Sequence, residues 1–278
     1  MRLCVVGGSG FLGSELCRQA RLRNWSVTAT RFRSAPPADL ADDPGIEWRT
    51  LDLRQPGFTL DALTEADAVV NAAYVQDGDD VRAVTTDAPA ALAAATPSDV
   101  PFVHISTDLV FAGDRSMPYT ETDAPSPIHD YGRAKADAES GVLRVRPDAT
   151  IVRTSLLYGF PRTGRIEQDI LDAAAGNKSM TFYTDEIRCP THVTSLARAL
   201  LEQVISPNRI EGPLHLTGSE PMNRATFARR IARAYGQTTR QMRYGPRPVG
   251  GSPRPKHVVL ESIYSAEMLG IAPLPADE

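Results

Sequence analysis

The sequence predicts an α/β protein built on a doubly wound parallel sheet, and three observations lead to this prediction. An apolar run from Leu3 to Val6 indicates a buried strand, and it ends in a cluster of glycines. Leu12, Leu16 and Ala20 then recur at intervals of four, which is typical of one helix face. Further apolar strands alternate with helical segments along the first half of the chain, and this alternation favours parallel β-α-β units.

The glycine cluster predicts a dinucleotide site. Gly7, Gly10 and Gly13 fit G-x-x-G-x-x-G, and Gly8 in place of Gly7 also allows G-x-G-x-x-G. Between a strand and a helix, glycines let the backbone approach a pyrophosphate, and the helix N-terminus offers it free N–H groups. A glycine turn in another α/β fold is the alternative. For this Rossmann-type turn we expect cofactor contacts from Gly7, Ser9, Gly10, Phe11, Leu12 and Gly13.

The end of the second strand, residues 26–30, indicates which dinucleotide binds. Sites for NAD commonly place an acidic residue there, but after Glu15 the next acid is Asp39. Arg31 and Arg33 follow the strand instead, and a guanidinium suits a 2′-phosphate. We therefore expect NADPH as the cofactor, with NADH still possible; two solvated arginines are the alternative.

The next two strands add cofactor candidates at their ends. The third strand, residues 46–53, should end beside the adenine, and the fourth, residues 67–73, ends in small side chains that let a cofactor pass closely. Ligands of such sheets bind at the carboxyl ends of the strands. The residues expected to contact the cofactor here are Asp52, Leu53, Ala72 and Ala73.

A tyrosine and a lysine supply the candidate acid–base chemistry. Tyr131 and Lys135 are four residues apart on a helix that Ser126 and Pro127 can open, so both should lie on one face. A nearby ammonium should lower the pKa of the tyrosine hydroxyl. Thr107 follows the fifth strand, residues 101–106, and could share the substrate oxygen. A chance Y-x-x-x-K on a helix is the alternative.

Composition and charge argue against several classes of function. The 278 residues carry a net charge of −4 without a basic stripe, so we expect no nucleic-acid or membrane partner. No apolar run approaches the length of a membrane span, and the N-terminus enters a strand at once, so no signal peptide is expected. Cys4, Cys17 and Cys189 show no metal or redox spacing. We expect buried thiols, no metal site and a cytoplasmic protein.

These motifs together resemble the extended short-chain dehydrogenases/reductases, and within them the dTDP-4-dehydrorhamnose reductase branch. The resemblance includes the glycine turn and covers nearly the whole chain. Its other motifs are S-T-D-L-V-F at 106–111, P-Y-x-E-x-D-x-P at 118–125, Y-G-R-A-K at 131–135, R-T-S at 153–155, the stretch 185–191 and Arg254-Pro255. We expect residues 185–191 to form a loop.

The resemblance implies a catalytic triad and a sugar-nucleotide substrate. Tyr131 would protonate the carbonyl oxygen of a 4-keto sugar as hydride reaches its carbon. Lys135 would hold the nicotinamide ribose and tune Tyr131, and Thr107 would position the carbonyl. The residues that it places near the substrate are Asp108, Leu109, Leu156, Arg188 and Arg254, with Lys256 as a further cation.

Three departures from the family pattern bear on the substrate and on a metal. Leu109 and Leu156 stand where the family often has tyrosine and tryptophan, so the pocket should be aliphatic. Leu109 also replaces the glutamate of the 4,6-dehydratases, which argues against dehydration. Some members bridge a dimer through magnesium-bound glutamates; Glu15 matches one of these, but Thr194 replaces another. We expect no such metal, and a monomer or a homodimer.

The resemblance also implies two lobes and leaves alternative functions open. Residues 1–158, with about 193–220, would form the NADP-binding domain, and residues 159–192 and 221–278 the substrate lobe. The expected function is NADPH-dependent reduction of a nucleotide-activated 4-keto-6-deoxyhexose. The alternatives are a reductase or epimerase of another sugar nucleotide or of a small ketone, and a non-catalytic NADP-binding regulatory subunit.

Overall fold

A single parallel sheet of seven strands organises the described part of the chain, which the computed structural model gives as residues 1–55, 57, 61–159, 163–248, 250 and 253–261. The strand order is β11-β6-β5-β4-β1-β2-β3, so the chain winds outward from β1 in both directions. This confirms the predicted doubly wound α/β fold. The strands are β1 (Arg2–Val6), β2 (Ser26–Arg31), β3 (Ile46–Thr50), β4 (Ala68–Asn71), β5 (Phe102–Thr107), β6 (Thr150–Thr154) and β11 (Gly212–His215).

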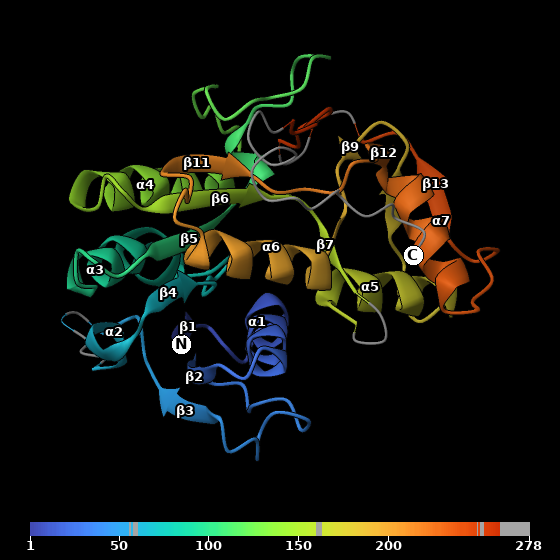
Figure 1. The fold of residues 1–278 in the computed structure, drawn as a ribbon. Coiled ribbons are helices and arrows are strands. Elements are labelled where there is room, and N and C mark those ends of the chain that lie inside the picture. The colour runs from blue at the N-terminus through green and yellow to red at the C-terminus, as the bar shows by residue number, and fades with distance from the viewer. Residues whose placement is uncertain (56, 58–60, 160–162, 249, 251–252, 262–278) are drawn as a thin grey trace.

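Helices cover both faces of the sheet (Figure 1). Leu3 and Val5 of β1 pack toward the face that carries α1 and α6, whereas Cys4 and Val6 pack toward the face of α2, α3 and α4. Because successive strand side chains point to opposite faces, an unbroken apolar run is what a strand buried on both sides requires. These helices are α1 (Phe11–Leu22), α2 (Ala62–Glu65), α3 (Ala88–Ala95), α4 (Asp130–Val145) and α6 (Val193–Ile205).

A second hydrophobic cluster lies beyond the carboxyl ends of the strands. Ile170 of α5 and Phe227 of α7 pack there with Tyr158, Phe182 and neighbouring side chains. Figure 1 shows α5, α7 and several short strands gathered at this end. The assignment of 159–192 and 221–278 to a substrate lobe stays a prediction, and residues 160–162, 249, 251–252 and 262–278 of it lie outside the described ranges. The elements here are α5 (Arg165–Ala174), α7 (Arg224–Ala234), β7 (Leu157–Tyr158), β8 (Thr181–Tyr183), β9 (Ile187–Arg188), β10 (Thr191–His192), β12 (Met222–Asn223) and β13 (Arg243–Gly245).

The helix that carries Tyr131 begins later than predicted. We expected Ser126 to cap it, but α4 starts at Asp130 and its cap is His129. Ser126 is used elsewhere, because its backbone N–H donates to the Val110 carbonyl at 2.8 Å and its hydroxyl accepts from the Ala112 N–H at 3.3 Å. These bonds tie Ser126 to the preceding loop.

Two further segments differ from the prediction. The fourth strand stops at Asn71, since the Asn71 side chain accepts a hydrogen bond from the Ala73 N–H and turns the chain. The stretch 185–191, expected as a loop, contains β9, which pairs with β12 in the second cluster. A π-helical turn (η1, Arg82–Asp87) also precedes α3.

Candidate active site

The glycine turn between β1 and α1 is built for close approach of backbone to backbone. Gly7 has φ +84°, and a Cβ there would lie 2.8 Å from the Ala73 backbone. A Cβ on Gly13 would lie 2.1 Å from the Gly7 carbonyl oxygen. Gly10, the N-cap of α1, brings no side-chain acceptor. The first N–H groups of α1 therefore have no side-chain acceptor at the cap, and an anion could take that place.

A first cavity, of about 300 Å³, opens beside this turn and over the ends of β2 and β3. It brings together the candidates that the sequence placed at three separate strand ends. Arg31 is half-buried at its wall, and Arg33 is exposed. The predicted residues that line it are Gly7, Ser9, Gly10, Arg31, Arg33, Asp52, Leu53, Ala72 and Ala73.

Phe32 and Arg54 also line this cavity, and the sequence analysis missed both. Arg54 binds Asp52 through two nitrogens, at 2.8 and 2.7 Å, and its guanidinium lies 4.6 Å from the Phe32 ring centroid. These hydrogen bonds hold the pKa of Asp52 well below its usual range. Asp52 therefore stays ionised and paired with Arg54. The signal for Arg54 was its place just after the strand end, where polar residues gather.

A second cavity, of about 260 Å³, adjoins the first, because Gly10, Ala72 and Tyr74 line both. All three candidate catalytic residues line it, with the two leucines that mark the departure from the family pattern. Tyr74 was not predicted, although it follows Ala72-Ala73 at a strand end. The predicted residues that line this cavity are Gly10, Phe11, Leu12, Gly13, Ala72, Thr107, Leu109, Tyr131, Lys135, Leu156 and Arg188.

Lys135 is almost completely buried, at 3% exposure, and its ammonium is held from two sides. Its Nζ donates to the Ile105 carbonyl oxygen at 2.8 Å and lies 5.6 Å from the ring centroid of Tyr74. Burial lowers the pKa of Lys135 to about 8, against the opposing charge of Glu139. Lys135 is therefore mainly protonated at pH 7.

We predicted that the Lys135 ammonium would lower the pKa of Tyr131, and this prediction is wrong. Tyr131 is half-buried, and desolvation raises the pKa of its hydroxyl, with smaller contributions from Tyr74 and Asp108. Arg188, rather than Lys135, is the cation that opposes the rise. The ammonium of Lys135 is instead directed at the Ile105 carbonyl. Tyr131 thus keeps its proton at neutral pH, as a proton donor must.

A buried carboxylate underlies Thr107. The Thr107 hydroxyl donates to Asp108 at 3.2 Å, and Ser155 donates to the same carboxylate. Arg188 binds Asp108 through Nε, at 2.7 Å, and through Nη2. Asp108 was predicted to lie near the substrate, but it is fully buried and lines none of the three cavities. It holds the Thr107 hydroxyl from beneath the site.

A third cavity, of about 290 Å³, adjoins the second, and Leu109, Tyr131 and Arg188 line both. Arg254 lines its far side with a half-exposed guanidinium, 3.7 Å from the Glu186 carboxylate. Lys256, the other predicted cation, does not line it. Of the two arginines, only Arg254 presents a charge that solvent reaches, because Arg188 is buried against Asp108.

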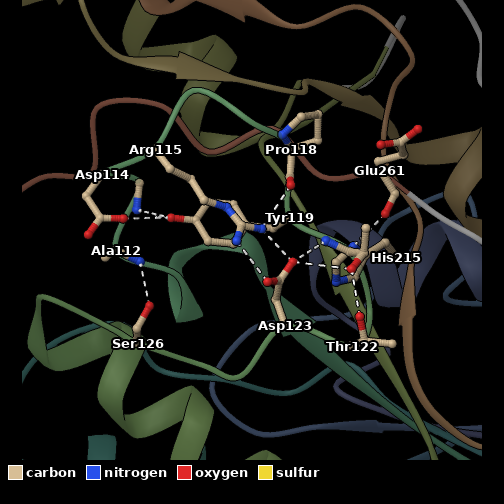
Figure 2. Close-up of polar contacts among 12 residues, drawn as sticks. Ala112, Asp114, Arg115, Pro118, Tyr119, Thr122, Asp123, Ser126, His215 and Glu261 are labelled. Carbon is tan, nitrogen blue, oxygen red and sulfur yellow. Dashed lines mark hydrogen bonds and ion pairs between the residues drawn. The ribbon is translucent and has the colours of Figure 1, made fainter.

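The side chains of the P-Y-x-E-x-D-x-P motif make contacts that stabilise the structure. Figure 2 shows Arg115 bound to Asp123, at 2.9 Å between Nη1 and Oδ1, and lying over Tyr119. Tyr119 stacks on Phe111 with centroids 4.3 Å apart, and its N–H donates to the Val259 carbonyl. The motif thereby fastens the loop after β5 to the C-terminal segment that carries Arg254.

Glu15, the family's magnesium position, is engaged by protein donors. Its Oε1 accepts from Thr194 at 2.9 Å and from Gln19 at 2.8 Å, and its Oε2 lies 2.6 Å from Arg18. Within the described ranges no group of three His, Cys, Asp or Glu side chains could hold a metal ion, and all three cysteines are buried and free. No helix in the described part of the chain is long and apolar enough to cross a membrane.

Comparison with known proteins places the chain in one family. A family model described as the RmlD substrate binding domain matches residues 1–275. A dTDP-4-dehydrorhamnose reductase of Mycolicibacterium smegmatis is 30% identical, over 98% of this chain and 81% of its own. Methionine adenosyltransferase 2 subunit beta of Rattus norvegicus is 29% identical, over 97% of this chain and 83% of its own.

A solved structure agrees with these matches. The crystal structure of a dTDP-4-dehydrorhamnose reductase from Clostridium acetobutylicum has a TM-score of 0.73 and 26% identity, covering 94% of this chain and 90% of that one. The family model spans almost the full length, and the resemblance carried by the motifs is thereby confirmed. The chain belongs to the RmlD substrate binding domain family of extended short-chain dehydrogenases/reductases.

Proposed function

We propose that this protein is an NADPH-dependent reductase of a nucleotide-activated 4-keto-6-deoxyhexose, with Tyr131 as the proton donor. The observation that carries the proposal is the row of three adjoining cavities, in which each shares lining residues with the next. They run from the arginines after β2, past Tyr131 and Lys135, to Arg254. A relative at 30% identity is named dTDP-4-dehydrorhamnose reductase, which supports the same reaction class.

The residues of the first cavity fit a dinucleotide 2′-phosphate. A Cβ at Gly7 would collide with the Ala73 backbone, so only glycine lets the turn pack this closely on the end of β4, beside the first cavity. Arg31 and Arg33 stand at the end of β2, and Arg54 is added from the end of β3. Bound NADPH would supply a hydride to the substrate carbon. Arg31 and Arg33 would hold its 2′-phosphate by charge-assisted hydrogen bonds.

Tyr131 would supply the proton. As hydride adds to the carbonyl carbon, negative charge develops on the carbonyl oxygen, and the Tyr131 hydroxyl transfers its proton there. The raised pKa of Tyr131 keeps the hydroxyl protonated until an oxyanion of still higher basicity forms. The phenolate that remains then regains a proton from solvent.

Lys135 and Thr107 would set the geometry of this step. Lys135 is fixed by the Ile105 carbonyl beside the same cavity, where it would hold the nicotinamide ribose. The Thr107 hydroxyl is held by Asp108 and by the Leu109 N–H, at 3.2 Å each, beside the same cavity. Leu109 and Leu156 make the sugar end of that cavity aliphatic, and Arg254 would meet the substrate diphosphate in the third cavity.

Oxidation of NADPH, followed by its absorbance, tests the proposal. The substrates are dTDP-4-dehydrorhamnose and a panel of other 4-keto sugar nucleotides, and NADH runs in parallel. We expect one member of the panel to be reduced rapidly with NADPH. Tight NADPH binding without turnover of any panel member would contradict the proposed substrate class and favour a small ketone.

A non-catalytic role is the second candidate. It is favoured by the 29% identity to methionine adenosyltransferase 2 subunit beta over most of the chain. The chain itself keeps Thr107, Tyr131 and Lys135 on one cavity, which weighs toward turnover. Recovery of a stoichiometric enzyme partner in a pull-down, from cells that express the tagged chain, would support the regulatory role.

A further inference from the structure

The first turn of α4 is closed by a histidine. His129 has extended backbone angles, and its Nδ1 accepts a hydrogen bond from the Gly132 N–H at 2.8 Å. Its carbonyl accepts from the Arg133 N–H at 3.0 Å, so both side chain and backbone cap the helix. Only a neutral imidazole can do this, because a protonated ring carries a hydrogen on each nitrogen and cannot accept.

The capped turn is the one that carries Tyr131, and it is packed tightly. A Cβ on Gly132 would lie 2.2 Å from the Leu109 carbonyl oxygen and 3.0 Å from the His129 ring. The His129 and Tyr131 rings lie 6.4 Å apart between centroids and nearly parallel. The turn that carries Tyr131 is therefore packed at Gly132 against the His129 ring and the Leu109 backbone, whose N–H binds Thr107.

The surroundings of His129 favour its neutral form. Burial is the largest influence, and the charges of Arg188 on β9, Arg133 on α4 and Arg254 on the C-terminal segment act in the same direction, whereas a backbone hydrogen bond at His129 itself favours the protonated ring. The acids that line the same cavity are Asp77, Asp130 and Glu186. Asp130 is almost fully exposed and bound by Arg133, and Glu186 lies near both Arg188 and Arg254. The pKa of His129 is lowered from 6.5 as a result.

We propose that His129 is a positioning residue for Tyr131, which holds the proton donor in place only while the imidazole is neutral, so that acidification uncaps α4 and stops reduction. This inference rests on the proposed reductase function. The protonated ring would lose the Gly132 bond and would add a positive charge at the positive end of the helix. Acid inactivation would then originate at the cap, while the Tyr131 hydroxyl itself stays protonated.

The test compares His129→Asn and His129→Ala with the wild type over a range of pH. Asparagine offers an acceptor oxygen at the N-cap but does not titrate. His129→Ala should lower kcat roughly tenfold or more at every pH, since small misplacements of a catalytic group are costly. His129→Asn should restore most of that loss, and it should lack the fall in kcat that the wild type shows as the pH drops below 6.5.

The chain offers a matched control in His192. It caps α6 in the same way, with Nδ1 accepting from the Thr194 N–H at 3.3 Å, but it lines none of the three cavities. His192→Asn should leave the acid limb of kcat unchanged. An acid limb that persists in His129→Asn would overturn the proposal, and so would one that disappears equally in His192→Asn.

Thermal unfolding against pH separates this inference from the proposed reaction. Because the folded pKa of His129 lies below its unfolded value of 6.5, the unfolded chain binds the proton first, and stability falls as pH drops from 6.5 toward the folded pKa. His129→Asn should lose less stability over this window than the wild type. If no keto sugar is reduced but this difference in stability is found, the proposed reductase function is wrong, whereas the capping of α4 by neutral His129 is supported. Equal losses of stability in His129→Asn and the wild type would refute the proposal that only the neutral His129 ring caps α4.

Discussion

Replacing Asp108 by asparagine removes one charge from the buried pair beneath the active site. Asp108 is fully buried, and the side chain of Arg188 is 5% exposed, so the pair is shielded from solvent. Asparagine preserves the volume and can still accept from Ser155. The variant therefore leaves Arg188 as a buried cation without its main partner, and the perturbation is one of charge more than of packing.

The size of the effect follows from what remains around Arg188. Breaking a buried ion pair by removing one partner costs about 3–5 kcal/mol. Glu186 stays 3.8 Å from Arg188 Nη1 and compensates part of the charge, so we expect the lower end, about 3 kcal/mol. For a chain of this size that corresponds to a fall in Tm of roughly 6–12 °C.

Urea unfolding and calorimetry of Asp108→Asn measure this loss directly. Asp130→Asn is the matched control, because Asp130 pairs with Arg133 on the surface at 99% side-chain exposure, and we expect no measurable change. The apolar double variant Asp108→Leu/Arg188→Met should be more stable than Asp108→Leu alone. A loss below about 1 kcal/mol for Asp108→Asn would refute the view that the pair is energetically coupled in the buried site.

Three further predictions concern the cofactor, the pH dependence and the C-terminal segment. Arg31→Ala should weaken NADPH binding about tenfold to a hundredfold and leave NADH binding nearly unchanged; equal weakening in calorimetric titrations would exclude a 2′-phosphate contact. Burial lowers the pKa of Lys135 to about 8, so the charge is lost above that pH, and kcat/KM should fall on the alkaline side near pH 8. The variant Lys135→Arg should not show this alkaline fall, even if its activity is lower throughout. A fall that persists in Lys135→Arg would mean that another group causes it. Gly113 has φ +66° and a Cβ there would lie 2.7 Å from Pro255, so Gly113→Ala should destabilise the fold by about 1 kcal/mol or more in urea titrations; an unchanged midpoint would contradict it.

The residues predicted for the cofactor end of the site come from local sequence signals, and the structure brings them to one cavity. Gly7, Gly10 and Gly13 are required by a turn whose geometry is set within a few residues, and strand ends such as Ala72-Ala73 follow from apolar periodicity. In a parallel sheet those ends meet at one edge, so separate local signals combine into one cavity. Nearly all of the predicted cofactor and substrate residues therefore line the three cavities.

The parts that sequence reasoning missed depend on partners far along the chain. Asp108 and Arg188 are 80 residues apart, and nothing local indicates that one neutralises the other. The Tyr131 pKa was misjudged for the same reason. Lys135 lies one helical turn away, but the sequence does not show that its Nζ binds the Ile105 carbonyl or that the site is desolvated.

The start of α4 shows how a local rule can point to the wrong residue. Ser126-Pro127 has the composition of a helix start, yet its hydrogen-bonding groups are taken up by Val110 and Ala112 from the loop after β5. The capping role passes to His129, a residue type that cap statistics do not favour. Here tertiary contacts override propensity, and they do so beside the proposed proton donor.

In the proposed reaction Tyr131 protonates the carbonyl oxygen, and the variant Tyr131→Phe removes that proton. The measurement is NADPH oxidation with the best keto sugar nucleotide of the panel, together with NADPH binding to the same variant. Phenylalanine keeps the ring between His129 and Tyr74 but cannot donate a proton. We expect kcat to fall by roughly a hundredfold or more while NADPH binding is retained. Turnover at the wild-type rate in Tyr131→Phe would show that Tyr131 is not the proton donor.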